Sequence, residues 1–108
     1  MKSDESEGKV QILTEINKLI HEPARLMILS LLYVVESADF VWIKGQTGLT
    51  DGNLSSHLSK LENAGYTIVE KRFKNKKPNT LLKLSEGGRK AFEEYRKKLT
   101  QILAGSNN

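Results

Sequence analysis

The residues whose type and spacing point most directly to chemistry are the cations between positions 66 and 84. This stretch has a net charge of +5, with Glu70 as its only carboxylate. The whole chain of 108 residues has a net charge of +4, so the rest of it is close to neutral, at −1. A concentrated basic patch is typical of a surface that binds phosphate. The same lysines could instead serve only solubility, or protect an exposed strand edge.

Other kinds of chemistry find little support in the sequence. The chain contains no cysteine, which excludes disulfides, thiolate nucleophiles and cysteine zinc sites. Neither of the two histidines, His21 and His57, has a carboxylate pair repeated at metal-ligand spacing. We therefore expect no metal site, no catalytic residues and no cofactor. A lone His57 beside an apolar stripe is more typical of a packed, hydrogen-bonded side chain.

The basic stretch is predicted to be a β-hairpin. Residues 66–73 are rich in β-branched and aromatic side chains and roughly alternate in polarity, as a strand does. Asparagine and proline mark a turn over residues 74–79, and residues 80–84 return as a second strand. Several lysines would then lie close together at one hairpin tip. Bound anions would relieve the electrostatic repulsion between them.

Helices are predicted on both sides of this hairpin, which makes the fold class mainly α with a small β-hairpin. Apolar residues recur at helical spacing, and Pro23, Gly48 and Gly65 interrupt them. Residues 1–8 are polar and acidic and are predicted to be a disordered tail, whereas residues 9–104 would form a single domain. The predicted helices cover residues 9–20, 23–35, 40–47, 51–64 and 86–103.

Two of these helices have the spacing of a helix-turn-helix. Residues 40–47 and 51–64 are joined by a three-residue turn that begins with Gly48 and ends with Thr50, a good helix cap. Asp39 is the candidate cap of the first of them.

The helix over residues 51–64 has two contrasting faces. Leu54, Leu58 and Leu61 form an apolar stripe. The opposite face has short hydrogen-bonding side chains and one lysine but no carboxylate, which suits close approach to base edges and phosphates. A simpler explanation is that these side chains only cap the helix, but capping does not account for Ser56 or Ser59.

The segment TGLTDGNLSSHLSKLENAGY, followed by the basic hairpin and by LSEGGRKAFEEY, resembles winged helix-turn-helix transcriptional regulators of the MarR/ArsR-like type. The upstream HEPARLMIL resembles the opening helix of that family, and the resemblance covers about residues 20–100. It implies a recognition helix over 51–64 in a major groove of double-stranded DNA, and a wing over 66–84 on phosphate or the adjacent minor groove. The DNA-facing residues that it implies are Thr50, Asn53, Ser55, Ser56, Ser59 and Lys60 on the helix, and Arg72, Lys74, Asn75, Lys76 and Lys77 on the wing.

Trp42 departs from the family pattern, in which a polar residue usually stands at this place on the short helix. We expect its ring to pack against the protein or to form part of an interface rather than to contact DNA.

The end helices offer more apolar surface than a small core easily absorbs. In the last helix, apolar side chains at spacings of 3, 4 and 3 form a short seam. We therefore predict that the N- and C-terminal helices form an isologous homodimer, which would place two recognition helices about one DNA turn apart. The predicted interface residues are Ile12, Ile16, Leu19, Phe92, Tyr95, Leu99 and Ile102.

These observations favour a sequence-specific, double-stranded DNA-binding transcriptional regulator that is not an enzyme. The alternative is a winged-helix protein-interaction module without specific DNA binding. Single-stranded or RNA targets are less well supported, because the chain lacks an aromatic stacking platform. We expect no membrane association and a cytoplasmic, nucleoid-associated location, since the sequence shows no spanning segment and no signal peptide. The sequence does not identify a small-molecule effector.

Overall fold

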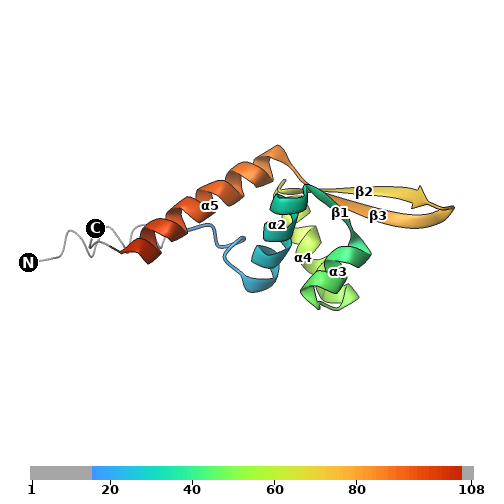
Figure 1. The fold of residues 1–108 in the computed structure, drawn as a ribbon, viewed down its shortest axis with the longest axis horizontal. Helices are drawn as coiled ribbons and strands as arrows, with labels where there is room; N and C mark the ends of the chain where they lie inside the picture. Colours follow the sequence, from blue (N-terminus) through green and yellow to red (C-terminus); the bar gives the residue numbers. More distant parts are fainter. Residues whose placement is uncertain (1–15, 106–108) are drawn as a thin grey trace, which may run out of the picture.

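The computed structural model describes residues 16–105 (Figure 1). Three antiparallel strands form one sheet in the order β1-β3-β2. The β2–β3 hairpin projects from one side of the helical body and α5 extends in the opposite direction (Figure 1). The elements are α2 (Pro23–Val35), β1 (Ser37–Asp39), α3 (Phe40–Thr47), α4 (Asp51–Asn63), β2 (Thr67–Lys74), β3 (Lys77–Leu84) and α5 (Glu86–Ala104).

Side-chain caps set the beginnings of the helices. The carboxylate of Asp39 accepts the backbone N–H of Trp42 at 2.7 Å, and the hydroxyl of Thr50 accepts that of Asn53 at 3.1 Å. Such caps satisfy N–H groups that have no partner within the helix. Gly48, in the left-handed conformation at φ 73°, ends α3. The predicted caps and the helix-turn-helix spacing are therefore confirmed.

The first predicted helix is not seen in the part of it that the structure describes. Residues 9–15 lie outside the described residues, as does the tail predicted over 1–8. Residues 16–20 form a turn, in which the side-chain oxygen of Asn17 accepts the backbone N–H groups of Leu19 and Ile20 at 3.0 and 3.1 Å. An asparagine that bonds its own neighbouring backbone competes with helix formation. The turn still buries Ile16 and Ile20 in the core.

A strand that the sequence did not predict lies between α2 and α3. The predicted helices over 23–35 and 40–47 leave residues 36–39 without an assigned structure, but Ser37–Asp39 form β1, which pairs with β3 at Ser37↔Lys83 and Asp39↔Leu81. Three residues are too few to show the alternation of a strand. The prediction of an isolated hairpin is therefore corrected to a sheet of three strands.

The hairpin turn is shorter than the six residues predicted. Lys74 pairs directly with Lys77, and only Asn75 (φ 53°) and Lys76 (φ 66°) form the turn. Two positive φ angles match the twist of a type I′ hairpin. Pro78 was expected to break the strand, yet it pairs with Phe73. In a two-residue hairpin this second pair is not hydrogen-bonded, so the ladder between the strands loses nothing from the missing N–H of proline.

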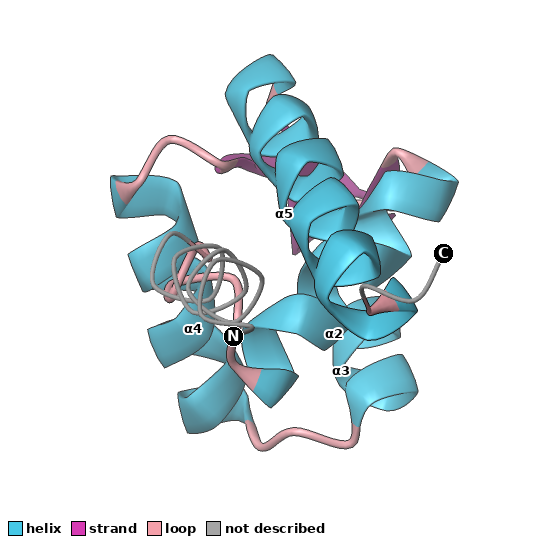
Figure 2. Ribbon diagram, turned by 90° about the vertical axis from the view of Figure 1, so that its left-hand side faces the viewer, coloured by secondary structure: helices cyan, strands magenta, loops and turns pink. Residues whose placement is uncertain are grey.

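The core lies where α2, α3, α4 and the inner part of the sheet meet. Figure 2 looks toward the C-terminal end of α5 and shows α4 to the left of α2 and α3. The largest side chains that are fully buried are all aliphatic: Ile20, Ile28, Leu29, Leu32, Ile43, Leu54, Leu61 and Leu82.

The apolar seam predicted on α5 is used largely within the chain. Phe92 and Tyr95 are 5% and 2% exposed, and the hydroxyl of Tyr95 lies 2.7 Å from Nδ1 of His21. Burial raises the pKa of Tyr95 above its ordinary value. Leu99 and Ile102 are only half-buried. An interface between copies, which stays a prediction, would have to use this distal part of α5, because Phe92 and Tyr95 are already packed.

The first turn of α5 lies directly against the backbone at Tyr66. A Cβ atom added at Gly88 would overlap the carbonyl oxygen of Tyr66 and crowd the side chain of Leu84. At Gly87, the nearest atom to an added Cβ is the carbonyl oxygen of Gly65, at an ordinary 3.5 Å. Gly88 is therefore required for this close approach, and Gly87 is not.

We predict opposite effects of alanine at these neighbouring positions. Gly88→Ala should lower the free energy of unfolding by about 1–3 kcal/mol, because α5 must move away from the sheet. Gly87→Ala should raise it by about 0.5–1 kcal/mol, because alanine loses less backbone entropy in a helix. Urea denaturation of both variants measures the difference, and equal effects would contradict the close packing.

Candidate nucleic-acid interface

The orientation of α4 is set by its apolar stripe. Leu54, Leu58 and Leu61 are 0%, 5% and 0% exposed, so burial of this stripe turns the opposite face of the helix to solvent. The buried leucine stripe and the solvent-facing polar side of α4 both match the sequence prediction. The exposed residues on the outer face are Gly52, Asn53, Ser56, Ser59, Lys60 and Asn63.

One flank of α4 is bound to the start of α2 through Arg25. Its Nη1 donates to Nδ1 of His57 at 3.1 Å, and its Nε donates to the carbonyl oxygen of Leu19 at 2.6 Å. Arginine can only donate, so Nδ1 of His57 accepts. Arg25 thus links three segments: the turn before α2, α2 and α4. His57 is a packed, hydrogen-bonded side chain, as its place beside the stripe predicted.

The carboxylate of Glu22 completes this cluster. It accepts the backbone N–H of Arg25 at 2.8 Å as the cap of α2, and its Oε1 lies 3.9 Å from Nη1 of Arg25 and 3.8 Å from Nδ1 of His57. The bond from the Arg25 N–H is the main cause that holds the pKa of Glu22 below its ordinary value of 4.5.

The other flank of α4 faces the sheet across a groove of about 440 Å³. Ser55, Ser59 and Glu62 line the helix side, and Lys71 and Thr80 line the sheet side. Lys71 was not among the predicted site residues. The alternation of Val69, Lys71 and Phe73 places them on one face of β2, but only the packing of the sheet shows that this face is the one beside α4.

The cations of the hairpin are divided between its two faces. Cross-strand pairing places Arg72 and Lys74 on the face opposite Lys71, together with Lys77. Lys76 belongs to the turn. The predicted wing residues therefore share the hairpin tip, but they do not form one face with the polar residues of α4.

The positive charge of the hairpin increases toward its tip. Near the base, Nζ of Lys83 lies 3.2 Å from a carboxylate oxygen of Glu70. Among the described residues, no acidic side chain lies within ion-pair distance of Lys71, Lys74 or the lysines at positions 76 and 77. Arg72 is oriented by a neutral partner, since its Nε donates to the side-chain oxygen of Asn79 at 2.9 Å.

The acidic residue at the start of α4 is also paired. Nζ of Lys44 lies 2.9 Å from a carboxylate oxygen of Asp51 and so joins the end of α3 to the first turn of α4. Both side chains remain substantially exposed, at 42% and 74%, so the pair adds little stability. Its effect on the outer face is to offset the negative charge of Asp51.

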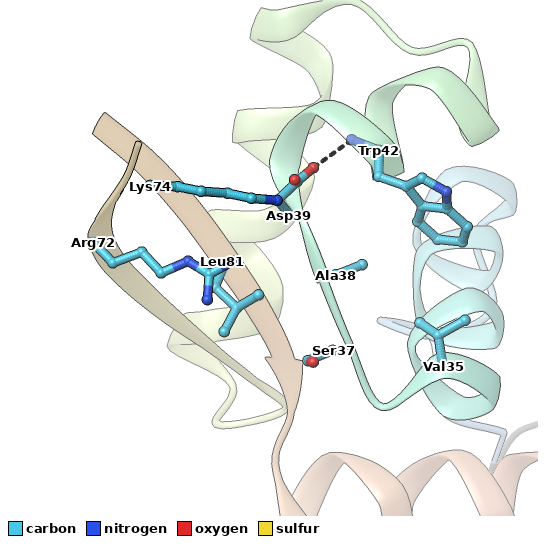
Figure 3. Close-up of a pocket in the computed structure, with 8 residues that line it drawn as sticks. All are labelled: Val35, Ser37, Ala38, Asp39, Trp42, Arg72, Lys74 and Leu81. Carbon is cyan, nitrogen blue, oxygen red and sulfur yellow. Dashed lines mark hydrogen bonds between the residues drawn. The ribbon is translucent and has the colours of Figure 1, made fainter. Parts of the chain in front are cut away.

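A second hollow, of about 430 Å³, lies on the other face of the sheet. Figure 3 shows Arg72 and Lys74 on one side of it, and Trp42 and Val35 on the opposite side. Trp42 is 40% exposed, so its ring is partly packed and remains reachable from solvent.

Residues 16–105 hold no cluster of three or more histidine, cysteine, aspartate or glutamate side chains suited to a metal ion. None of the helices in this part of the chain combines the length and the apolar character needed to cross a membrane.

A family model described as a winged helix DNA-binding domain matches residues 24–103, most of the chain. The chain belongs to the winged helix DNA-binding domain family. This confirms the family resemblance and the winged-helix fold predicted from the sequence. The family is non-enzymatic, which also confirms that the chain is not an enzyme.

A curated protein and a solved structure are similar to this winged helix domain over most of its length. The uncharacterized protein MJ0432 of Methanocaldococcus jannaschii is 37% identical over 91 residues, which cover 84% of this chain and 96% of the relative. A transcriptional regulator homologue of Pyrococcus horikoshii OT3 has a similar structure, with a TM-score of 0.82, 24% identity, and 90% and 95% of the two chains covered.

Two further solved structures share the fold at lower similarity. NadR in complex with 4-hydroxyphenylacetate has a TM-score of 0.67 and 20% identity, over 91% of this chain and 72% of that one. HlyU from Vibrio cholerae N16961 has a TM-score of 0.58 and 22% identity, over 89% and 97% of the two chains. At these identities, the likeness shows the fold alone.

The cluster around Glu22 predicts a pH dependence of stability for this winged helix domain. A carboxylate with a depressed pKa in the folded state stabilises that state above its ordinary pKa, and the contribution is lost as the pH falls through the folded value. Glu22→Gln should therefore be less stable than the wild type above pH 4.5, and the difference should close below it. Urea unfolding from roughly pH 3 to pH 7 measures this, and a difference independent of pH would contradict the assignment.

Proposed function

We propose that this chain is a transcriptional regulator that binds specific sequences in double-stranded DNA, with α4 in the major groove and the β2–β3 hairpin on phosphate and the minor groove. One observation carries the proposal. In a member of a DNA-binding family, the exposed face of α4 carries short hydrogen-bonding side chains, and the adjacent wing carries lysines without an ionic partner among the described residues.

Affinity in this proposal comes mainly from the wing. Lysine and arginine side chains displace condensed counterions from the DNA backbone, and this effect is independent of sequence and sensitive to salt. Lys74, Asn75, Lys76 and Lys77 lie at an exposed tip, and Arg72 lies just behind it. Lysines suit phosphates as point charges, whereas the arginine fork can reach into a narrow minor groove.

Specificity comes from the exposed face of α4. Asn53 can form two hydrogen bonds with an adenine edge, and serine hydroxyls can donate or accept. The small size of Gly52 and Ser56 lets the helix approach the bases closely. Thr50, Ser55, Ser59 and Lys60 are also exposed or at the edge of this face, where phosphate contacts would fix the register of the helix.

A homodimer remains part of the proposal. The structure of one chain leaves Leu99 and Ile102 half-buried and Leu103 76% exposed at the distal end of α5. Leu19 is also half-buried, in the turn before α2. Leu19, Leu99 and Ile102 are the available part of the predicted interface, to which we add Leu103, and Ile12 lies outside the described residues. Two copies joined in this way would read two half-sites.

Removal of the wing charges should weaken binding without changing its sequence preference. Replacing Lys74, Lys76 and Lys77 together with alanine should lower affinity for every duplex. The slope of log K against log salt concentration should fall by up to about 0.9 for each phosphate contact that is lost. Fluorescence anisotropy with labelled duplexes at several salt concentrations measures both quantities.

A matched control removes the same charge from elsewhere. Lys18, Lys90 and Lys97 are exposed and lie outside the wing and α4, so their triple alanine variant should keep most of the salt slope. If the two triple variants lose affinity equally, net charge rather than the wing is responsible for binding.

Selection of bound duplexes from a random pool tests specificity directly. The wild type should enrich a motif composed of two inverted half-sites, as expected of a symmetric dimer. Asn53→Ala and Ser56→Ala should change the preferred base within each half-site, because each good base contact contributes about 1–3 kcal/mol. Asn63→Ala, on the same face but at the end of α4, should leave the motif unchanged.

The selection also separates the proposal from its alternative. A protein-interaction module would enrich no motif and would show only weak, salt-sensitive attraction to any duplex. A single half-site in the enriched motif would retain the DNA-binding proposal and remove the dimer.

A further inference from the structure

We propose that Phe73 is a minor-groove wedge: its ring enters the minor groove beside the major groove occupied by α4 and partly unstacks a base step there. This inference rests on the proposed function and adds a contact to it. Neither the basic pattern of the hairpin nor the polar face of α4 assigns a role to an apolar side chain at the wing tip.

The first observation is the exposure of Phe73. Phe73 is 76% exposed, although it is paired with β3, one residue before the end of β2. Its cross-strand partner is Pro78, in a pair where side chains approach closely, so the two rings form one small apolar surface. The hairpin tip projects well beyond the helices (Figure 1), and Phe73 and Pro78 are both exposed.

The second observation is the face on which Phe73 lies. Strand alternation places it with Val69 and Lys71, on the side of the sheet that faces α4. Arg72 and Lys74 point to the opposite face. A duplex that contacts the outer face of α4 would therefore have the ring of Phe73 on the near face of the hairpin.

The third observation is distance along the strand. Lys71 and Ser59 line the same groove, so Lys71 lies where the phosphate wall beside α4 would run. Phe73 is two residues further out, which is about 7 Å along a strand. The minor groove is about 6 Å wide. The strand therefore carries the ring past the phosphate wall and into the adjacent groove.

The charge around Phe73 selects DNA as the occupant of this surface. Lys71, Lys74, Lys76 and Lys77 surround the tip, and none has an ionic partner among the described residues. Two like-charged tips would repel each other, which argues against a second copy of this chain. An apolar ring within a cluster of cations matches a minor groove, where stacked bases lie between two rows of phosphates.

The decisive experiment compares Phe73→Ala with the wild type on the duplex enriched by selection. Phe73→Ala should bind about 10-fold more weakly, with an unchanged salt slope, because no charge is removed. Phe73→Leu should retain most of the affinity, since leucine also acts as a wedge. Energy transfer between dyes at the two ends of the duplex should show a bend with the wild type that is smaller with Phe73→Ala.

Ile68→Ala is the matched control. Ile68 is also an exposed apolar residue of β2, at 49%, but it lies on the opposite face and near the base of the strand. This variant should bind and bend the duplex like the wild type. Because Phe73 is exposed, Phe73→Ala should also keep the thermal unfolding midpoint of the wild type.

Each outcome has a definite consequence. Equal affinity and equal bending by the wild type and Phe73→Ala overturn the wedge while leaving the proposed function intact. Unchanged DNA binding with an altered oligomeric state assigns Phe73 to contact between copies and also overturns it. Absence of binding by the wild type to any duplex overturns the proposed function, and the wedge with it.

Discussion

Burial of three leucines on one side of α4 is the constraint on which the candidate site depends. Leu54, Leu58 and Leu61 contribute to the core, so α4 can rotate about its axis only at the cost of exposing them. The outer face of the helix is therefore fixed by apolar packing rather than by its own polar residues. Arg25 adds a directional link on one flank, because its hydrogen bonds join α4 to α2 and to the preceding turn.

The three-stranded sheet holds the wing at its base and leaves its tip free. β1 pairs only with residues 81–83 of β3, so the inner end of the hairpin has a strand on each side of β3, whereas the outer end has only β2. The charges follow the same division. Glu70 and Lys83 pair near the base, and the lysines toward the tip have no ionic partner among the described residues. The hairpin is therefore held by strand pairing at its base, and its tip carries positive charge that no acidic side chain of the described residues offsets. This arrangement suits binding to an anionic partner.

Local signals predicted much of this architecture. Asp39 and Thr50 cap helices, and Gly48 ends one, because each acts on backbone groups only a few residues away. Interpretations that depended on distant partners were less successful. β1 is too short to be recognised without β3, and Pro78 stands in a strand because its pairing with Phe73 needs no N–H. The apolar spacing before Pro23 indicated a helix, but Asn17 turns the described part of that segment instead.

The sequence by itself determined the order of the elements, the buried stripe of α4 and the concentration of cations in one hairpin, since periodicity, capping and charge are local properties of the chain. Only the tertiary structure decided which way the faces of that hairpin point. The packing of Val69 and Leu82 beside α4 places Lys71 and Phe73 toward the polar helix and Arg72 and Lys74 away from it. Alternation divides a strand into two faces, but the choice between them is made by the element that packs against one of them.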